Sequence, residues 1–282
     1  MIENINWYPG HMKKTRELIK ENLKLVDLVI EVLDARIPIS SRNPIIDELV
    51  GGKPRVIALN KIDIASEKET KRWREYFAKE GSTPVAINAQ SGSGVSNLLK
   101  LLERIENELS AGKMRQKPLR MMIVGVPNVG KSSLINRLTG RKSAQIGNKP
   151  GVTKGKQWLK LKNGMELLDT PGILWPKFED NRVGIYLAFC GSIKDEILDL
   201  PTLALELIKV LKRDYPNLLL ERYKLDDSCL EYEDIELLDE ICRRRGYILP
   251  GKRIDYDRAG KAILDEFRSG KIGRITLELA GE

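Results

Sequence analysis

Short apolar runs alternate with longer amphipathic stretches through the first part of the chain. The stretches predict helices at 43–50, 67–79 and 95–109, with an N-terminal helix from Lys13 to Leu25 before them. The runs predict β-strands because they are rich in Val, Ile or Leu and bounded by polar or turn-forming residues: Leu28–Leu33, Arg55–Leu59, Thr83–Ile87 and Arg120–Val124. This alternation is typical of βα units around a mostly parallel sheet.

A hairpin is predicted toward the end of this part. Two apolar stretches, 157–162 and 165–168, are separated by Asn163-Gly164, and Asn-Gly is a strong hairpin signal because both residues tolerate a positive φ. The basic stretch Ser110–Pro118 has no periodicity and predicts a loop.

Helical periodicity dominates the second part of the chain. Pro201 suits the first turn of a helix, and Pro216 is expected to end one. Near the C-terminus Ile275, Leu277 and Leu279 alternate with polar residues and predict an extended stretch. We expect a small helical domain with three buried faces, formed by Leu203, Leu207, Ile208 and Leu211, by Ile235, Leu238, Ile241 and Cys242, and by Ile263 and Phe267.

Charge divides the chain at the same place. The formal net charge is +8, but residues 1–177 hold 31 basic and 18 acidic side chains, whereas residues 178–282 hold 17 and 22. The sign changes after Trp175-Pro176-Lys177, so we place the boundary there, between an α/β domain of residues 1–177 and a helical domain of residues 178–282. An excess of 13 positive charges in one domain favours an anionic partner, nucleic acid first.

Composition excludes several classes of protein. Apolar residues make up 41% and charged residues 31%, as expected of a soluble globular protein. No apolar run approaches the roughly 20 residues of a membrane helix, and the N-terminus lacks the apolar core of a secretory signal. Cys190, Cys229 and Cys242 are widely spaced, so we expect no disulfide framework, no zinc cluster and a cytoplasmic location.

A phosphate-binding motif follows the fourth predicted strand. Gly125-Val126-Pro127-Asn128-Val129-Gly130-Lys131-Ser132 matches GxxxxGK[ST], and a helical pattern, Ser133–Leu138, comes next. Strand, loop and helix in this order predict a P-loop, in which backbone N–H groups and the helix N-terminus hold phosphates. Lys131 is expected to reach the β- and γ-phosphates, and the Ser132 hydroxyl to ligate Mg²⁺.

Two further segments complete the predicted phosphate and magnesium site. Asp169-Thr170-Pro171-Gly172 follows an apolar run, so Asp169 is expected to hold Mg²⁺ and the Gly172 N–H to contact the γ-phosphate. The polar loop Lys149–Gly155 contains Thr153, which is expected to complete the magnesium shell when a γ-phosphate is bound; an ordinary surface loop is the alternative.

Asn60-Lys61-Ile62-Asp63 follows the second predicted strand and predicts recognition of guanine. The Asp63 carboxylate can accept hydrogen bonds from guanine N1–H and the exocyclic amine, a donor pair that adenine lacks. Asn60 and Lys61 are expected to brace the neighbouring loops and cover the base. Asn88-Ala89-Gln90-Ser91-Gly92 follows the next strand and is expected to offer the Ala89 N–H to the guanine oxygen, with Asn88 where Ser is usual.

The base motifs precede the P-loop, which is the reverse of the usual order. Residues 1–172 therefore resemble the circularly permuted P-loop GTPases. Three segments, Trp7-Tyr8-Pro9-Gly10-His11-Met12, Asp34-Ala35-Arg36-Ile37-Pro38 and Asp169–Pro176, narrow the resemblance to the ribosome biogenesis GTPase A family, also called YlqF-type. The similarity spans nearly the whole chain.

The resemblance implies a function that composition and spacing do not reveal. It implies GTP as the substrate, Mg²⁺ as the cofactor, and a late large-subunit precursor as the partner, contacted through rRNA and ribosomal proteins. No membrane partner is expected, and the chain is expected to be monomeric off the ribosome. The residues expected to bind GTP are Asn60, Lys61, Asp63, Asn88, Ala89, Asn128, Val129, Gly130, Lys131, Ser132, Ser133, Thr153 and Gly172.

The predicted site lacks the glutamine that orients the attacking water in Ras-like enzymes. Ile173 occupies the position where Ras-like enzymes carry the Gln that orients water, so intrinsic turnover is expected to be slow. His11 is the one histidine in the sequence, and an imidazole can take that role; a surface or capping residue is the alternative. The resemblance favours catalysis by His11. It also suggests that Asn128 helps to bind K⁺, and bracing of the loop by Asn128 is the alternative.

The remaining motifs concern the partner. Trp158 follows the loop Lys149–Gly155, and Trp175 follows Asp169-Thr170-Pro171-Gly172. We expect core packing for each tryptophan, and stacking on nucleic-acid bases is the alternative. Asp34 and Arg36 belong to the family motif, but the sequence offers no physical reason for them.

Two rival functions remain, a GTP-gated rRNA-binding module with negligible hydrolysis and an ATP-using enzyme, and Asp63 argues against the second. Basic clusters are expected to contact rRNA phosphates, and for any single lysine a solvated surface charge is the alternative. The clusters are Arg141, Lys142, Lys149, Lys154, Lys156, Lys160 and Lys162, then Arg243–Arg245 and Lys252-Arg253.

Overall fold

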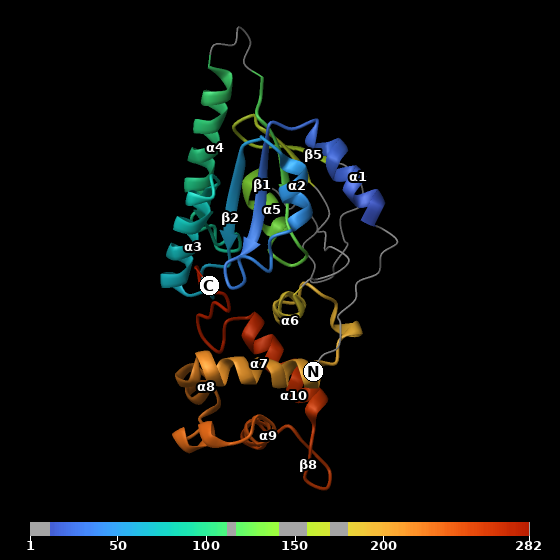
Figure 1. Cartoon of the computed structure of the whole chain (residues 1–282), viewed down its shortest axis with the longest axis vertical. Helices are drawn as coiled ribbons and strands as arrows, with labels where there is room; N and C mark the ends of the chain where they lie inside the picture. The colour runs from blue at the N-terminus through green and yellow to red at the C-terminus, as the bar shows by residue number, and fades with distance from the viewer. Residues whose placement is uncertain (1–11, 112–116, 141–156, 170–179, 282) are drawn as a thin grey trace. The chain divides into compact units, whose positions relative to one another are not determined.

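Six strands form one sheet in the part of the chain that carries the phosphate-binding motif. We describe a computed structural model, in which residues 12–111, 117–140, 157–169 and 180–281 are described, except for the side chains of 12–15, 18, 157 and 169 (Figure 1). The strand order is β3-β2-β1-β4-β6-β5, and only β5 and β6 pair antiparallel. The bounds are β1 (Leu28–Asp34), β2 (Arg55–Asn60), β3 (Thr83–Ala86), β4 (Arg120–Val124), β5 (Gln157–Lys160) and β6 (Glu166–Asp169). The predicted mostly parallel sheet and its hairpin are confirmed.

The register of the central strands gathers the sequence motifs at one edge. Asp34, the last residue of β1, lies opposite Asn60, the last residue of β2. On the other side of β1, Glu31 lies opposite Val124, after which the phosphate loop begins. Ligands of open α/β sheets bind outside the carboxyl ends of the strands, where the strand order reverses. This sheet reverses its order at β1, so its carboxyl edge is the place for a site.

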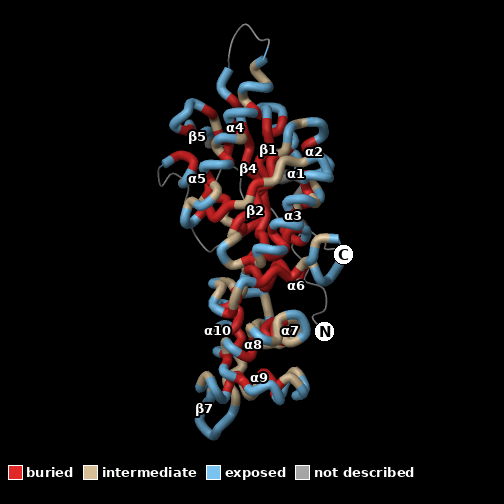
Figure 2. The backbone as a smooth tube through the Cα atoms, turned by 90° about the vertical axis from the view of Figure 1, so that its left-hand side faces the viewer, coloured by how far each residue is buried: buried red, intermediate tan, exposed pale blue. Residues whose placement is uncertain are grey.

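The centre of the sheet is fully buried. All seven residues of β1 are buried, and Figure 2 shows the central strands as buried along their length. Glu31 lies in the middle of β1, and its carboxylate forms an ion pair with Arg55 of β2. Burial raises the pKa of the Glu31 carboxyl, and the nearby Arg55 guanidinium partly opposes that rise. An ion pair therefore joins β1 and β2 in addition to their backbone hydrogen bonds.

Five helices of the described residues cover the sheet, and local signals explain their ends. Asn43 caps α2 by accepting from the Ile45 N–H, and Ser66 caps α3 by accepting from the Glu69 N–H. Gly94 precedes α4 with a φ of 75°, and a Cβ at that position would lie 2.2 Å from the Ala86 carbonyl oxygen. The bounds are α1 (Met12–Leu23), α2 (Pro44–Val50), α3 (Glu67–Lys79), α4 (Val95–Ser110) and α5 (Lys131–Thr139).

Trp158 on the edge strand β5 corrects one expectation. The sequence analysis placed this side chain in the core, but it is 40% exposed. The guanidinium of Arg120 lies over its ring, 5.2 Å from the centroid. An edge strand has a neighbour on one side only, so Trp158 is covered by a cation instead of by a second strand. Trp175 lies outside the described residues.

The described chain divides into two compact units. One comprises residues 12–169 and 276–281, and the other comprises residues 180–275. The predicted helical domain of residues 178–282 differs from this division at its C-terminal end. The reason is local, since the Leu277 N–H donates to the Arg36 carbonyl at 2.8 Å and Ala280 packs on the cluster that contains Trp73. The last described residues thus belong with the sheet.

The second unit is helical. Asp199 caps α7, with Pro201 in its first turn as predicted, and α7 ends at Asp214. Pro216 follows the end of that helix, as was expected, and it also begins α8. A capping box of Glu233 and Glu236 begins α9. The bounds are α6 (Asn181–Phe189), η2 (Asp195–Ile197), α7 (Leu200–Asp214), α8 (Pro216–Tyr223), η3 (Asp227–Glu231), α9 (Asp234–Arg245), β7 (Ile248–Leu249), β8 (Arg253–Ile254) and α10 (Tyr256–Arg268).

The predicted apolar faces hold in α7 and α10 and shift in α9. Leu203, Leu207, Ile208 and Leu211 are buried, as are Ile263 and Phe267. On α9, however, Ile235 is 45% exposed and Leu237 is buried in its place. The predicted face was wrong at that residue because Leu237 and Leu238 both turn inward together with Ile241.

No helix among the described residues is long and apolar enough to cross a membrane.

Candidate nucleotide site

The phosphate loop joins β4 to α5 through three unusual backbone positions. Gly125 has a φ of 150°, and a Cβ there would lie 2.5 Å from the Val32 carbonyl oxygen, so only glycine fits. Asn128 and Gly130 have φ values of 61° and 99°. The Lys131 ammonium is buried and donates to the Val126 carbonyl oxygen at 2.7 Å, across the loop. The strand, loop and helix of a P-loop are therefore all in place.

Asn60 connects this loop to the predicted base-binding loop. Its side-chain N–H donates to the Val129 carbonyl at 2.7 Å, and its Oδ1 accepts from the Ala89 N–H at 2.9 Å. The side chain is 3% exposed, so both bonds are shielded from water. Gly130 passes so close that a Cβ there would lie 2.2 Å from Asn60 Nδ2. One amide thus sets the distance between the two loops, as the predicted bracing role requires.

Asn88 shapes the loop whose Ala89 was expected to contact guanine. The Asn88 carbonyl oxygen Oδ1 accepts from the N–H groups of Gln90 and Ser91, each at 2.9 Å. An Asn side chain can accept from the backbone two residues onward in this way, which explains an Asn at this position. Arg137 of α5 holds the same loop from outside, since its guanidinium donates to the carbonyl oxygens of Ala89 and Gln90.

Asp63 and Lys61 of the predicted base-recognition motif have different surroundings. Asp63 is exposed, so its carboxylate can be reached by a base. Lys61 has a φ of 64°, and its ammonium lies 2.9 Å from Asp34 Oδ2. The Lys61 side chain is thereby tied to the end of β1.

Asp34 and Arg36 form a buried ion pair whose role the sequence left unexplained. Arg36 donates through Nε and Nη2 to the two Asp34 oxygens at 3.0 and 2.8 Å, and both side chains are 1% exposed. Burial alone would raise the pKa of the Asp34 carboxyl, but the charges of Arg36 and Lys61 outweigh it and hold that pKa well below its usual range. The missed signal was the position of Asp34 at a strand end beside Asn60.

Several predicted site residues lie outside the described part of the chain. His11, Thr153 and Gly172 are among them, and of Asp169 only the backbone is described, as the last residue of β6. Ser132 and Ser133 are half-buried in the first turn of α5. A hydroxyl at this helix start and a carboxylate at a strand end suit the oxygen-preferring Mg²⁺. Among the described side chains, no group of three His, Cys, Asp or Glu residues could hold a metal.

Comparison with known proteins decides the family. The family model described as "50S ribosome-binding GTPase" matches residues 120–224, which begin at β4 and include the P-loop. Ribosome biogenesis GTPase A of Bacillus cereus is 46% identical, with 99% of this chain and 95% of the relative covered. The chain belongs to the ribosome biogenesis GTPase A family. It is a GTPase of circularly permuted motif order, and Mg²⁺ is the metal that this family of enzymes generally uses.

Solved structures agree with this membership. A GDP-bound YlqF from Thermotoga maritima superposes with a TM-score of 0.72 and 31% identity, covering 94% of this chain and all of that one. A GNP-bound YlqF of the same organism gives a TM-score of 0.64 and 30% identity, with 95% and 99% covered. The likeness extends over the helical unit as well as the sheet.

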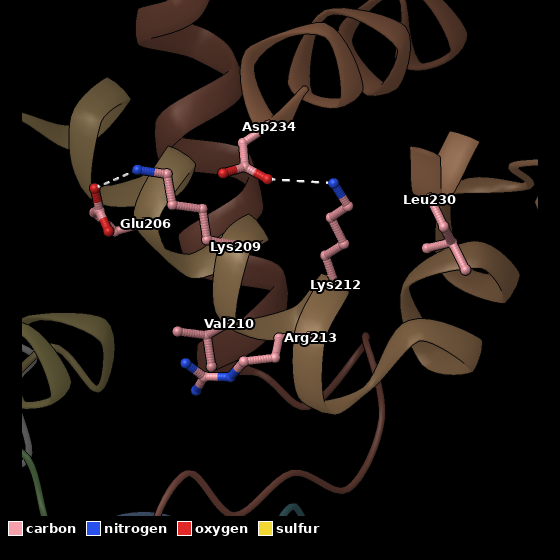
Figure 3. A pocket seen from close by; sticks show the side chains of 7 residues that line it. All are labelled: Glu206, Lys209, Val210, Lys212, Arg213, Leu230 and Asp234. Carbon is pink, nitrogen blue, oxygen red and sulfur yellow. Dashed lines mark hydrogen bonds and ion pairs between the residues drawn. The ribbon is translucent and has the colours of Figure 1, made fainter. Parts of the chain in front are cut away.

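The helical unit carries an open hollow of about 470 Å³ beside α7, apart from the motifs above (Figure 3). It is rich in cations, but those cations have partners, since Lys212 lies 3.5 Å from Asp234 and Lys209 lies 2.8 Å from Glu206. The expected rRNA-contacting cluster Arg243–Arg245 is similarly engaged, through ion pairs with Asp239, Glu240, Asp226 and Glu266. These guanidiniums therefore form their ion pairs within the helical unit.

Proposed function

We propose that this GTPase is an assembly factor for the late large ribosomal subunit, that the precursor particle stimulates its hydrolysis of GTP, and that hydrolysis leads to release. The observation that carries this proposal is the preformed link between the P-loop and the base loop through Asn60, in a chain that has Ile173 after the DxxG motif. A site that is built to hold guanine nucleotide but lacks a water-orienting Gln needs a partner to complete it. The family name supplies the ribosome as that partner.

Within this proposal the predicted site residues keep their roles. Asp63 reads guanine, the phosphate loop and Lys131 hold the phosphates, and Ser132, Thr153 and Asp169 hold Mg²⁺. The cytoplasm is the proposed location, consistent with three free and buried cysteines among the described residues. Off the ribosome the proposed state is a monomer.

Turnover of GTP with and without purified large subunits tests the central claim. Stimulation by the particle is expected, and ATP is expected not to compete with GTP. The second candidate function, a GTP-gated rRNA-binding module, rests on Ile173 and gives the opposite result: nucleotide-dependent binding with unchanged turnover. Co-sedimentation with large-subunit particles in GTP, GDP and a non-hydrolysable analogue measures the gating in both cases. Binding that ignores the nucleotide contradicts both functions.

His11 is the proposed catalytic residue. An imidazole that orients or deprotonates water is typically worth about 10²–10⁴-fold in rate. In the His11→Ala variant we expect GDP affinity to be retained and particle-stimulated turnover to fall by a factor of this order. Unchanged turnover would show that the catalytic group lies elsewhere, on the chain or on the particle.

K⁺ is the proposed second cation, with Asn128 as a ligand. Asn128 is an exposed residue of the phosphate loop and has a φ of 61°. K⁺ would supply positive charge near the transferred phosphoryl group, where an arginine finger acts in other GTPases. We expect turnover to fall when Na⁺ replaces K⁺. Equal rates in the two salts would assign Asn128 to loop geometry alone.

A further inference from the structure

The last described residues of the chain bind the loop that follows β1. We call residues 276–280 the C-terminal strap. The Glu278 carboxylate accepts from the Ile39 N–H at 2.6 Å and from the Ser40 N–H at 2.9 Å, and it also accepts from the Ser40 hydroxyl. Three donors on one carboxylate make this the most strongly bonded point of the strap, because hydrogen bonds to charged groups are the strong ones.

Neutral hydrogen bonds also hold the strap, at Thr276 and at the Glu278 carbonyl. The Thr276 hydroxyl accepts from the Ser66 N–H at 3.0 Å, and the Trp73 indole N–H donates to the Glu278 carbonyl at 2.9 Å. Thr276 is 1% exposed and Leu277 is buried. These contacts make the strap part of the unit that contains the sheet, although the strap follows the helical unit in sequence.

The strap lies one step from the buried ion pair. The Leu277 N–H donates to the Arg36 carbonyl at 2.8 Å, so the strap bonds to the backbone of the residue whose guanidinium grips Asp34. The same loop is held from within, because the Ser41 hydroxyl donates to the Ile37 carbonyl at 2.7 Å and accepts from the Asp34 N–H at 3.0 Å. The strap and this loop together fix the position of the Asp34 carboxylate.

Asp34 in turn holds Lys61, the second residue of the base-recognition motif, at 2.9 Å. We propose that the C-terminal strap positions the guanine-recognition motif, acting from Glu278 through the Arg36–Asp34 pair on Lys61; this rests on the guanine-binding role proposed above for Asn60-Lys61-Ile62-Asp63. The residues of the relay are positioning residues, and the strap contributes by ordering Lys61 before nucleotide binds. Ordering a long side chain before the nucleotide binds lowers the conformational-entropy cost of binding.

The expected effect follows from that entropy. Immobilising one flexible side chain on binding costs about 0.5–1.5 kcal/mol, so releasing Lys61 should weaken binding of GDP about two- to tenfold. The loss is expected to appear as faster dissociation, since changes in a formed site act mostly on that rate.

A double-mutant cycle on nucleotide affinity tests the relay. The full-length chain is compared with Glu278→Ala, Lys61→Met and the double variant, and GDP and ADP dissociation constants are measured by calorimetry. Glu278→Ala is expected to weaken GDP binding about two- to tenfold in the wild-type background, and to have no further effect once Lys61 is Met. Glu278→Gln, which keeps an acceptor for Ser40 and Ile39, is expected to fall between the two and covers the case in which the alanine variant does not fold.

The control is Glu75→Ala, which removes an exposed carboxylate from α3 in the same unit and should leave GDP affinity unchanged. An equal loss from Glu278→Ala in both backgrounds overturns the relay, because it shows a purely structural strap. Unchanged affinity in Glu278→Ala overturns it too. A wild-type chain that does not prefer GDP to ADP overturns the guanine site itself, and that result is read before any variant is compared.

Discussion

The amide of Asn60 offers the sharpest test of how the nucleotide site is built. Asn60→Ala deletes the donor to the Val129 carbonyl and the acceptor from the Ala89 N–H, and the residues at both ends are at most 2% exposed. Leaving one buried polar group without a partner costs about 1–3 kcal/mol, so two such groups predict a loss of about 2–6 kcal/mol in the free energy of unfolding. Because a typical domain is stable by about 5–15 kcal/mol, this loss should be easily measured.

The assay is urea unfolding followed by circular dichroism, paired with GDP affinity for the variants that remain folded. Asn97→Ala is the matched control, since Asn97 is exposed in the first turn of α4. Such a surface substitution normally changes stability by less than about 0.5 kcal/mol. Asn60→Asp separates the two bonds, because an aspartate can still accept from Ala89 but cannot donate to Val129. If Asn60→Ala loses no more stability than Asn97→Ala, the bridge between the loops contributes nothing and the reasoning fails.

Three further predictions concern separate features of the chain. Since the pKa of Asp34 lies below that of an unfolded chain, about 3.9, its stabilising contribution is complete above that pH and is lost as the pH falls below it; acid unfolding followed by fluorescence should therefore be less steep below pH 4 in Asp34→Asn. Gly94→Ala should lower the Tm more than Gly81→Ala, because both glycines have a positive φ but only the first would place its Cβ against the Ala86 carbonyl. Burial raises the pKa of the Cys242 thiol to about 12, so iodoacetamide at pH 8 should label it in urea but not in the native protein, as mass spectrometry can check.

The sheet could be predicted because its strands are locally encoded. β1, β2 and β4 are mostly apolar runs, with Glu31 as an interior exception in β1, and the Asn163-Gly164 turn sets the antiparallel pair. The P-loop was predictable for a related reason, since its glycines are required by backbone conformations that other residues rarely adopt. Gly125 and Gly130 both have a positive φ and close neighbours.

The features that escaped prediction depend on contacts between distant parts of the chain. The sequence offers no physical reason for Asp34 and Arg36, because only the pairing of β1 with β2 brings Asp34 beside the segment that carries Lys61. The strap looks like the end of the helical domain, because nothing in its own pattern names Ile39 and Ser40 as its donors. On α9 the error was one of phase, since adjacent Leu237 and Leu238 allow two helical faces and the packing chooses between them.

The strap gives the helical unit a second connection to the unit that carries the nucleotide motifs. In the permuted order the chain enters the helical unit after Asp169–Gly172, the segment that is expected to sense the γ-phosphate. It leaves that unit at Ile275 and runs directly into the strap, which holds the loop beside the base-recognition motif. The helical unit is therefore an insertion with two covalent connections to the nucleotide site, one toward the phosphates and one toward the base. The Glu278 cycle tests the second of these connections, because Glu278 lies in the strap and accepts from the loop beside the base-recognition motif.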